Sequence, residues 1–131
     1  MSHSPSIDCK AVIAACNFPP LIEQELLDFC DRTISKPQRT VRRKSIVGQK
    51  TIDARLYGVT SSIKTLIDIG FSIKTLQNVG EKHIEALHSV WTEEGVKHAL
   101  SPARIHNLNC FLRLYFEVHL GKRGLVKNVS D

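Results

Sequence analysis

With 131 residues the chain has the length of one ordinary domain, and its 42% hydrophobic and 24% charged content is typical of a globular protein. The longest apolar stretch without charge, residues 11–22, is interrupted by Asn17 and two prolines and falls short of the roughly 20 residues that span a membrane. The first residues also lack the basic and apolar regions of a secretion signal, so we expect an intracellular, cytoplasmic protein.

The cysteines and histidines do not indicate a metal or redox centre, because the four cysteines and six histidines are scattered along the chain. No cysteine falls in a C-x-x-C pair, and His83 and His88 lie five residues apart, on different faces of their helix. We expect no metal and no cofactor, and cysteines that act as small apolar residues in a reducing compartment.

The net charge of +5 is distributed unevenly. Residues 1–34 carry two basic and five acidic side chains, a net of −3, whereas residues 35–131 carry sixteen basic and eight acidic side chains, a net of +8. A basic body behind an acidic head favours a polyanionic partner.

The acidic head, residues 1–34, is predicted to be a helical N-terminal extension. A short helix over residues 7–18 ends at the Pro19-Pro20 pair, whose rings cannot continue a helix. A second, amphipathic helix follows over residues 20–33, because its apolar residues recur at helical spacing while acidic residues fill the other face. Its apolar positions are Leu21, Ile22, Leu26, Phe29 and Cys30.

The basic lead-in segment, residues 35–50, contains six basic residues and no acidic one: Lys36, Arg39, Arg42, Arg43, Lys44 and Lys50. Pro37 and Gly48 argue against one uninterrupted helix in this segment. Two interpretations fit the pattern equally, a solvated linker or a segment that binds a polyanion.

A long helix is predicted from about residue 49 to residue 69, and Gly70 ends it. Gly58 lies inside this helix, where it predicts close packing of another backbone. The core stripe of the helix is Ile52, Leu56, Val59, Ile63, Leu66 and Ile67.

A connector over residues 71–80 is expected to tuck Phe71, Ile73 and Leu76 under the core. The next helix is predicted over residues 81–94, with Gly95 just after its end. Its buried side comprises Ile84, Leu87 and Trp91, and we interpret Trp91 as a core anchor rather than a base-stacking platform.

The last helix begins with the strongest local signal, a Ser101 N-cap followed by Pro102, and it is predicted to reach about Leu120 and stop at Gly121. It is apolar around most of its circumference. Only a narrow strip stays polar, namely His106, Asn109, Arg113 and Glu117, of which the last two are expected to form an ion pair. Residues 121–131 read as a basic tail, a linker or a phosphate-contacting arm.

These elements together predict an all-α bundle of four to five helices without a sheet, because no apolar alternation of the strand type occurs. The predicted core consists of Leu56, Ile63, Ile67, Leu87, Trp91, Leu108, Leu112 and Tyr115. No nucleotide-binding glycine motif, nucleophile elbow or metalloprotease motif is present, so no enzymatic activity is expected.

The order of features over residues 40–126 resembles the SAM-like N-terminal, core-binding domain of phage and prophage tyrosine-type integrases. The matching features are a basic lead-in, the helix of residues 51–70 ending in Ile-Gly-Phe, and Asn-Val-Gly-Glu-Lys-His-Ile from Asn78 with Trp91 behind it. Leu100-Ser101 then opens the last helix, which holds Asn107 and Leu112-Arg113, before Gly-Lys-Arg-Gly-Leu-Val. Residues 51–120 are accordingly assigned as the core-binding-like domain.

The resemblance implies one half of a DNA clamp, in a protein tied to DNA integration and recombination of a mobile element. Basic residues of the lead-in and the tail are then expected to contact phosphates, whereas Arg104 and Asn107 are candidates for base contacts. Arg113 is left out because its ion pair accounts for it. The expected contacts with double-stranded DNA come from Arg39, Arg42, Arg43, Lys44, Lys50, Arg104, Asn107, Lys122 and Arg123.

The chain departs from this family in its catalytic equipment. Only five residues follow Val126, no His-x-x-Arg occurs, and Tyr57 and Tyr115 lie within predicted helices, so we expect no strand cleavage. Two alternatives remain open at this point. The chain is a helical adaptor that binds a recombinase or transposase subunit through its acidic head, or it is the remnant of a truncated integrase.

Overall fold

The computed structural model describes residues 9–34, 48–98 and 101–127, with the backbone alone for residues 94–98. These ranges contain helices and no strand, which confirms the predicted all-α fold. The elements are α1 (Cys9–Ala15), α2 (Pro20–Arg32), α3 (Gln49–Asp68), η1 (Leu76–Asn78), α4 (Glu81–His98), α5 (Pro102–Leu112) and η2 (Arg113–His119). Among the described helices none is long and apolar enough to cross a membrane.

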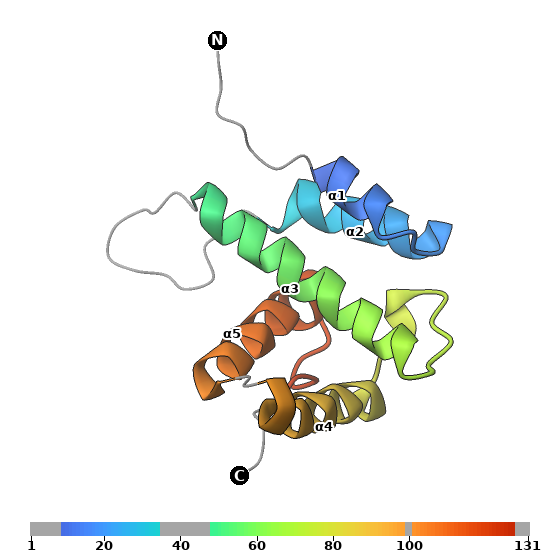
Figure 1. Cartoon of the computed structure of the whole chain (residues 1–131). Coiled ribbons are helices and arrows are strands. Elements are labelled where there is room, and N and C mark those ends of the chain that lie inside the picture. The colour runs from blue at the N-terminus through green and yellow to red at the C-terminus, as the bar shows by residue number, and fades with distance from the viewer. Residues whose placement is uncertain (1–8, 35–47, 99–100, 128–131) are drawn as a thin grey trace.

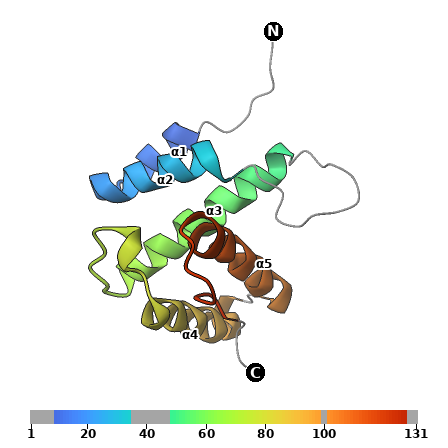
Figure 2. The same cartoon turned by 180° about the vertical axis from the view of Figure 1, so that it is seen from behind.

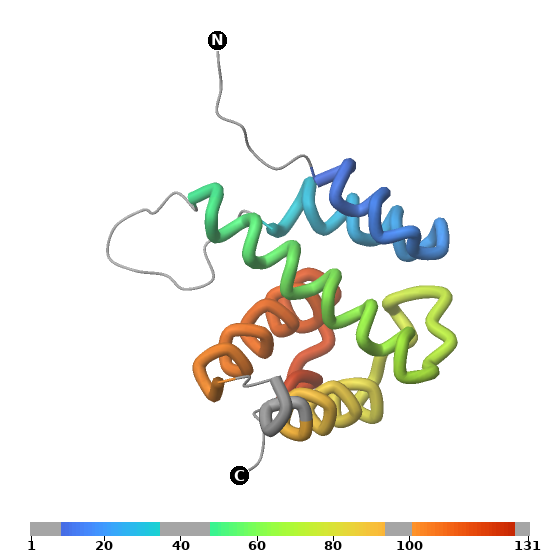
Figure 3. Tube along the Cα trace, viewed as in Figure 1, coloured from blue at the N-terminus to red at the C-terminus, as the bar shows by residue number. Residues whose placement is uncertain are grey.

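The helix α3 is the axis of the molecule, and the other helices are arranged around it (Figures 1 and 2). The α1–α2 hairpin lies along one side of α3, and α4 lies along the opposite side. Helix α5 and its continuation η2 cross behind α3 in the view of Figure 1, and Figure 3 shows this path as a tube. Every layer of the bundle therefore packs against α3.

The hairpin of α1 and α2, predicted as an acidic helical extension, belongs to the same core as the rest of the described chain. Phe29 of α2 is fully buried and meets the ring of Tyr115 edge-on, with ring centroids 4.9 Å apart. Such a pair adds about 0.5–1.5 kcal/mol to the burial of the two side chains. The guanidinium of the buried Arg55 also donates to the carbonyl oxygen of Ile34 at 2.7 Å, which ties the end of the hairpin to α3.

The predicted core is confirmed at seven of its eight positions, namely Leu56, Ile63, Leu87, Trp91, Leu108, Leu112 and Tyr115. The eighth, Ile67, is only half-buried and packs against the edge of the cluster. The connector also behaves as expected, because Ile73 and Leu76 are buried and Phe71 stacks on His83 with centroids 4.6 Å apart.

Two glycines of α3 were expected to have structural roles, Gly70 at the end of the helix and Gly58 at a close contact. Gly70 has φ +114° and ends the helix in the left-handed conformation expected there. Gly58 does allow close packing, but its neighbour is the ring of Phe111 on α5 rather than a backbone. A Cβ added at Gly58 would overlap that ring and lie 3.1 Å from the Cβ of Phe111.

The prediction that Gly95 ends the fourth helix is wrong, because α4 continues through Gly95 to His98. A glycine within a helix costs only about 1 kcal/mol relative to alanine, so one glycine did not suffice to end it. At the other end, the Gly80 amide donates to Nδ1 of His83 at 2.9 Å, which satisfies a backbone donor at the start of the helix.

The start and end of the last helix are confirmed, whereas its winding and polar strip differ from the prediction. The Ser101 hydroxyl accepts from the amide of Arg104 at 3.1 Å, and Gly121 follows the helix with φ +79°. Its final seven residues, η2, are wound as a π-helix. Asn109, a member of the predicted polar strip, is buried, and its side chain bonds to His88 at 2.8 Å and to the carbonyl of Lys127 at 3.5 Å.

Candidate nucleic-acid interface

Exposed polar and basic side chains lie at the N-terminal ends of α3 and α5, away from the Gly58–Phe111 contact where the two helices pack together. Lys50 is exposed in the first turn of α3, and Arg104 and Asn107 are exposed in the first half of α5. The N-terminal ends of both helices point to the same side of the molecule in both views (Figures 1 and 2). Three of the predicted site residues therefore lie on the same side of the molecule.

The crossing itself fixes how α5 presents its side chains. Arg104, Asn107 and Phe111 follow each other at spacings of three and four residues, which places them on one stripe of the helix. Phe111 packs against Gly58, so this stripe borders α3. The guanidinium of Arg104 and the amide of Asn107 consequently extend from the edge of α5 that is next to α3.

Four predicted site residues, Arg39, Arg42, Arg43 and Lys44, lie outside the described residues. The two residues at which their segment joins the fold are described. Ile34 is held to Arg55 of α3 by the 2.7 Å hydrogen bond, and Gly48 is the N-cap of α3. Both Ile34 and Gly48 thus lie at the N-terminal half of α3.

The tail follows the body of the protein more closely than a linker would. Val126 is buried, its amide donates to Oε2 of Glu117 at 2.8 Å, and its carbonyl accepts from Nε of Arg113 at 3.1 Å. The expected partners Arg113 and Glu117 therefore meet at the tail backbone. These two hydrogen bonds to the backbone of Val126 hold the tail along α5 and η2.

Two of the predicted phosphate contacts lie in this tail, and the structure places them differently. Nζ of Lys122 donates to the carbonyl of Val79 at 2.9 Å and to that of Gln77, which satisfies the end of η1. Lys122 therefore has a structural role that its sequence context did not suggest. Arg123 is exposed, and Lys127 forms an ion pair with Glu81 at 3.4 Å.

A polar cluster lies between α2 and η2, and the sequence did not predict it. The Thr33 hydroxyl and Nδ1 of His119 are 2.6 Å apart, and Nε2 of His119 lies 3.4 Å from the carboxylate of Asp28. A cavity of about 640 Å³ opens beside them, also lined by Arg32 and Gln77. The contacts span 86 residues of sequence, so no local pattern could have revealed them.

No group of three or more potential metal ligands occurs among the described residues, and none of the four cysteines takes part in a disulfide. Burial raises the pKa of the Tyr115 hydroxyl and of the Cys30 thiol well above their usual ranges, so both remain protonated at neutral pH. Neither is an activated nucleophile.

Comparison with known proteins finds no matching family model, no similar curated protein and no similar solved structure.

Proposed function

We propose that this protein is a non-catalytic module that binds double-stranded DNA, mainly through phosphate contacts, and serves site-specific recombination or integration of a mobile element. The observation that carries the proposal is the attachment of the basic segment. Five basic residues without an acidic one lie between Ile34 and Gly48, and both of these residues sit at the N-terminal half of α3. Arg104 and Asn107 are exposed on the neighbouring stripe of α5.

The distribution of charge over the fold supports a defined orientation on DNA. The acidic side chains of α2 lie on one flank of α3, and the exposed end of α5 lies on the other (Figure 1). A polyanion is repelled from the acidic side chains of α2 and attracted to the exposed Lys50 and Arg104, so the charges disfavour contact through the hairpin. The order of sequence features that resembles integrase core-binding domains supports the same partner and the link to recombination.

A salt series with a fluorescent duplex of mixed sequence tests the proposal. Each neutralised phosphate releases counterions and adds about 0.9 to the slope of log affinity against log salt. Replacing Arg42, Arg43 and Lys44 together by alanine should weaken binding to every duplex and flatten the slope by about 2 to 3 units. A folded triple variant that binds as tightly as the wild type at every salt concentration contradicts the proposal.

The base-contact candidates call for a different readout. Asn107→Ala should weaken binding by about 1–3 kcal/mol on a preferred duplex only, because an amide that reads a base edge does not change nonspecific affinity. A preferred duplex can be selected from a random pool with the wild-type protein. Equal losses of affinity on selected and unselected duplexes would show that Asn107 contacts the DNA phosphates and does not read a base.

One observation favours the alternative, an adaptor that binds a recombinase or transposase subunit. Leu21 is 53% exposed on α2, beside the acidic side chains of the same helix. An apolar side chain with acidic neighbours suits a basic protein surface. If the triple variant keeps its DNA affinity while Leu21→Asp abolishes binding to a co-purified recombinase, the adaptor replaces the DNA-binding module.

A further inference from the structure

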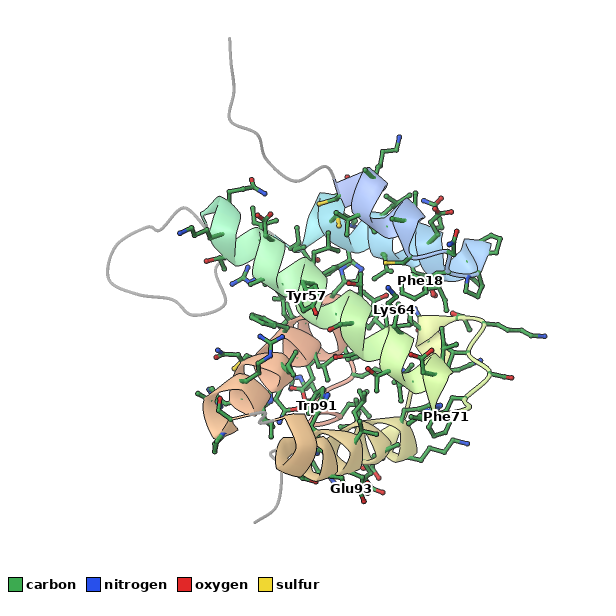
Figure 4. The ribbon with its side chains drawn as sticks, in the orientation of Figure 1. Phe18, Tyr57, Lys64, Phe71, Trp91 and Glu93 are labelled. Atoms are coloured by element: carbon green, nitrogen blue, oxygen red, sulfur yellow. The ribbon has the colours of Figure 1, made fainter. Side chains whose placement is uncertain are left out.

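A second exposed stripe runs along the outer side of α3, and none of the sequence predictions used it as a whole. It consists of Lys50, Ala54, Tyr57, Ser61 and Lys64, which we call the outer ridge of α3. These residues recur at spacings of three and four, so they share one face of the helix. Lys50, Tyr57 and Lys64 are exposed, and Figure 4 shows Tyr57 and Lys64 on α3.

Tyr57 is the unusual member of the outer ridge. It is 59% exposed, the largest exposed fraction among the large apolar side chains that the structure describes. Its neighbours along the ridge, Ala54 and Ser61, are too small to cover it. An exposed tyrosine, with an apolar ring and a polar hydroxyl, is typical of a residue that contacts a ligand or a partner.

The charges along the outer ridge indicate what that ligand is. Tyr57 lies two helical turns from Lys50 on one side and two turns from Lys64 on the other. Two acidic residues of α3 lie close to the ridge. Asp53 accepts a hydrogen bond from Gln49 at 2.8 Å, and Asp68 lies on the same face one turn beyond Lys64. Between Lys50 and Lys64 the ridge itself carries two positive charges and no acidic member, and Gly48, the N-cap of α3, lies at its Lys50 end.

The dimensions of the outer ridge match a groove of duplex DNA. The fourteen steps along the chain from Lys50 to Lys64 extend about 21 Å along the helix axis at about 1.5 Å per residue. The major groove is about 12 Å wide and admits an α-helix. A ridge that crosses the groove thus has one lysine over the phosphates on each side, with Tyr57 above the groove floor between them.

We propose that the outer ridge of α3 lies across the major groove, with Lys50 and Lys64 on opposite phosphate strands and Tyr57 in contact with base edges. This inference rests on the proposed DNA-binding function and adds a specificity-determining residue to it. Tyr57 offers a hydroxyl that can donate to or accept from a base and a ring edge that can contact a thymine methyl group.

The test compares single variants on a fluorescent duplex of about 20 base pairs selected by the wild-type protein, between about 50 and 200 mM salt. Tyr57→Ala should lower affinity about tenfold without changing the salt slope, because its side chain is uncharged. Lys50→Ala and Lys64→Ala should each flatten the slope by about 0.9. Tyr57→Phe should lie between the wild type and Tyr57→Ala, because it keeps the ring and loses the hydroxyl.

Matched controls come from other faces of the bundle. Leu21→Ala removes an equally exposed apolar side chain from α2, and Lys82→Ala removes an exposed lysine from α4. Both should leave affinity and salt slope unchanged. All variants alter exposed side chains, so their thermal unfolding should match that of the wild type.

Three results overturn the inference. If Tyr57→Ala binds the selected duplex as tightly as the wild type while the Arg42, Arg43 and Lys44 triple variant loses affinity, the ridge faces solvent in the complex. If the wild type prefers the matching single strand and Tyr57→Phe is unaffected, Tyr57 stacks on bases. If Tyr57→Ala abolishes only binding to another protein, the ridge is a protein interface. Wild-type protein that binds no duplex at low salt contradicts the proposed function itself, which is a separate outcome.

Discussion

The contact between Gly58 and Phe111 determines how α5 sits on α3, and replacing Gly58 by alanine tests it. Alanine is a better helix former than glycine by about 1 kcal/mol, so the change would stabilise a helix with free space at this position. In this protein the new Cβ at position 58 overlaps the Phe111 ring. It also lies 3.0 Å from Cγ and 3.1 Å from Cβ of Phe111, so a small rotation of the ring does not relieve the clash. Overpacking of this kind costs about 1–3 kcal/mol.

The two effects oppose each other, and the clash should prevail. We expect Gly58→Ala to lower the free energy of unfolding by about 1 kcal/mol, measured by urea denaturation followed by circular dichroism. In a Phe111→Ala background the clash is gone, so the same substitution should raise stability by about 0.5–1 kcal/mol. The reversal of sign between the two backgrounds is the specific prediction. Stabilisation by Gly58→Ala in the wild-type background would show that Phe111 does not press on Gly58.

Three further predictions concern the core, a helix cap and a histidine. Leu112→Ala should lower the free energy of unfolding by about 2–5 kcal/mol because the side chain is fully buried, and a loss below about 0.5 kcal/mol in urea denaturation would contradict that position. Ser101→Ala should cost about 1 kcal/mol in the same assay by removing the acceptor of the Arg104 amide, and an unchanged midpoint would mean that the cap is dispensable. Burial lowers the pKa of His83 below its usual 6.5, with Lys82 and Lys122 acting in the same direction. The unfolded chain therefore binds more protons, so stability is present above the unfolded pKa and is lost as the pH falls towards the lowered value. His83→Asn keeps an acceptor for the Gly80 amide and should remove that part of the loss, which thermal unfolding at pH 7 and pH 5 would show; parallel losses in both proteins would contradict it.

Local rules predicted the helix ends well wherever one residue dominates the local energetics. Ser101 and Pro102 begin α5, and Gly70 ends α3, because an N-cap hydroxyl and a left-handed glycine act within one turn. Gly95 failed as an end signal because the same residue type is also tolerated inside a helix at modest cost. The π-helical winding of η2 left no trace in the apolar pattern, since that pattern covers almost the whole circumference of the helix.

Contacts between distant parts of the chain could not be predicted from periodicity. The sequence predicts the acidic head as a helical N-terminal extension, and the packing of Phe29 on Tyr115 in a common core had no signal in it. It predicts the tail as a linker or a phosphate-contacting arm, and the contacts of Arg113 and Glu117 with the backbone of Val126 had no signal either. Charge does not show where a segment packs, because backbone hydrogen bonds and buried rings decide it.

The candidate site was partly accessible from sequence. Exposure of Lys50, Arg104 and Asn107 agrees with their assignment as contact residues, whereas the carbonyl contacts of Lys122 give that residue a structural role. Tyr57 was missed because it was considered only as a possible nucleophile. Its spacing from Lys50 and Lys64 could have drawn attention to the outer ridge.

The location of DNA on the surface is the central claim, and amide NMR shifts of the full chain titrated with a short duplex test it most directly. The account predicts that the largest shifts fall on the outer ridge of α3 and on Arg104 and Asn107, with α1 and α2 nearly unchanged. Shifts concentrated on the acidic α1–α2 hairpin, with α3 and the start of α5 unaffected, would contradict it.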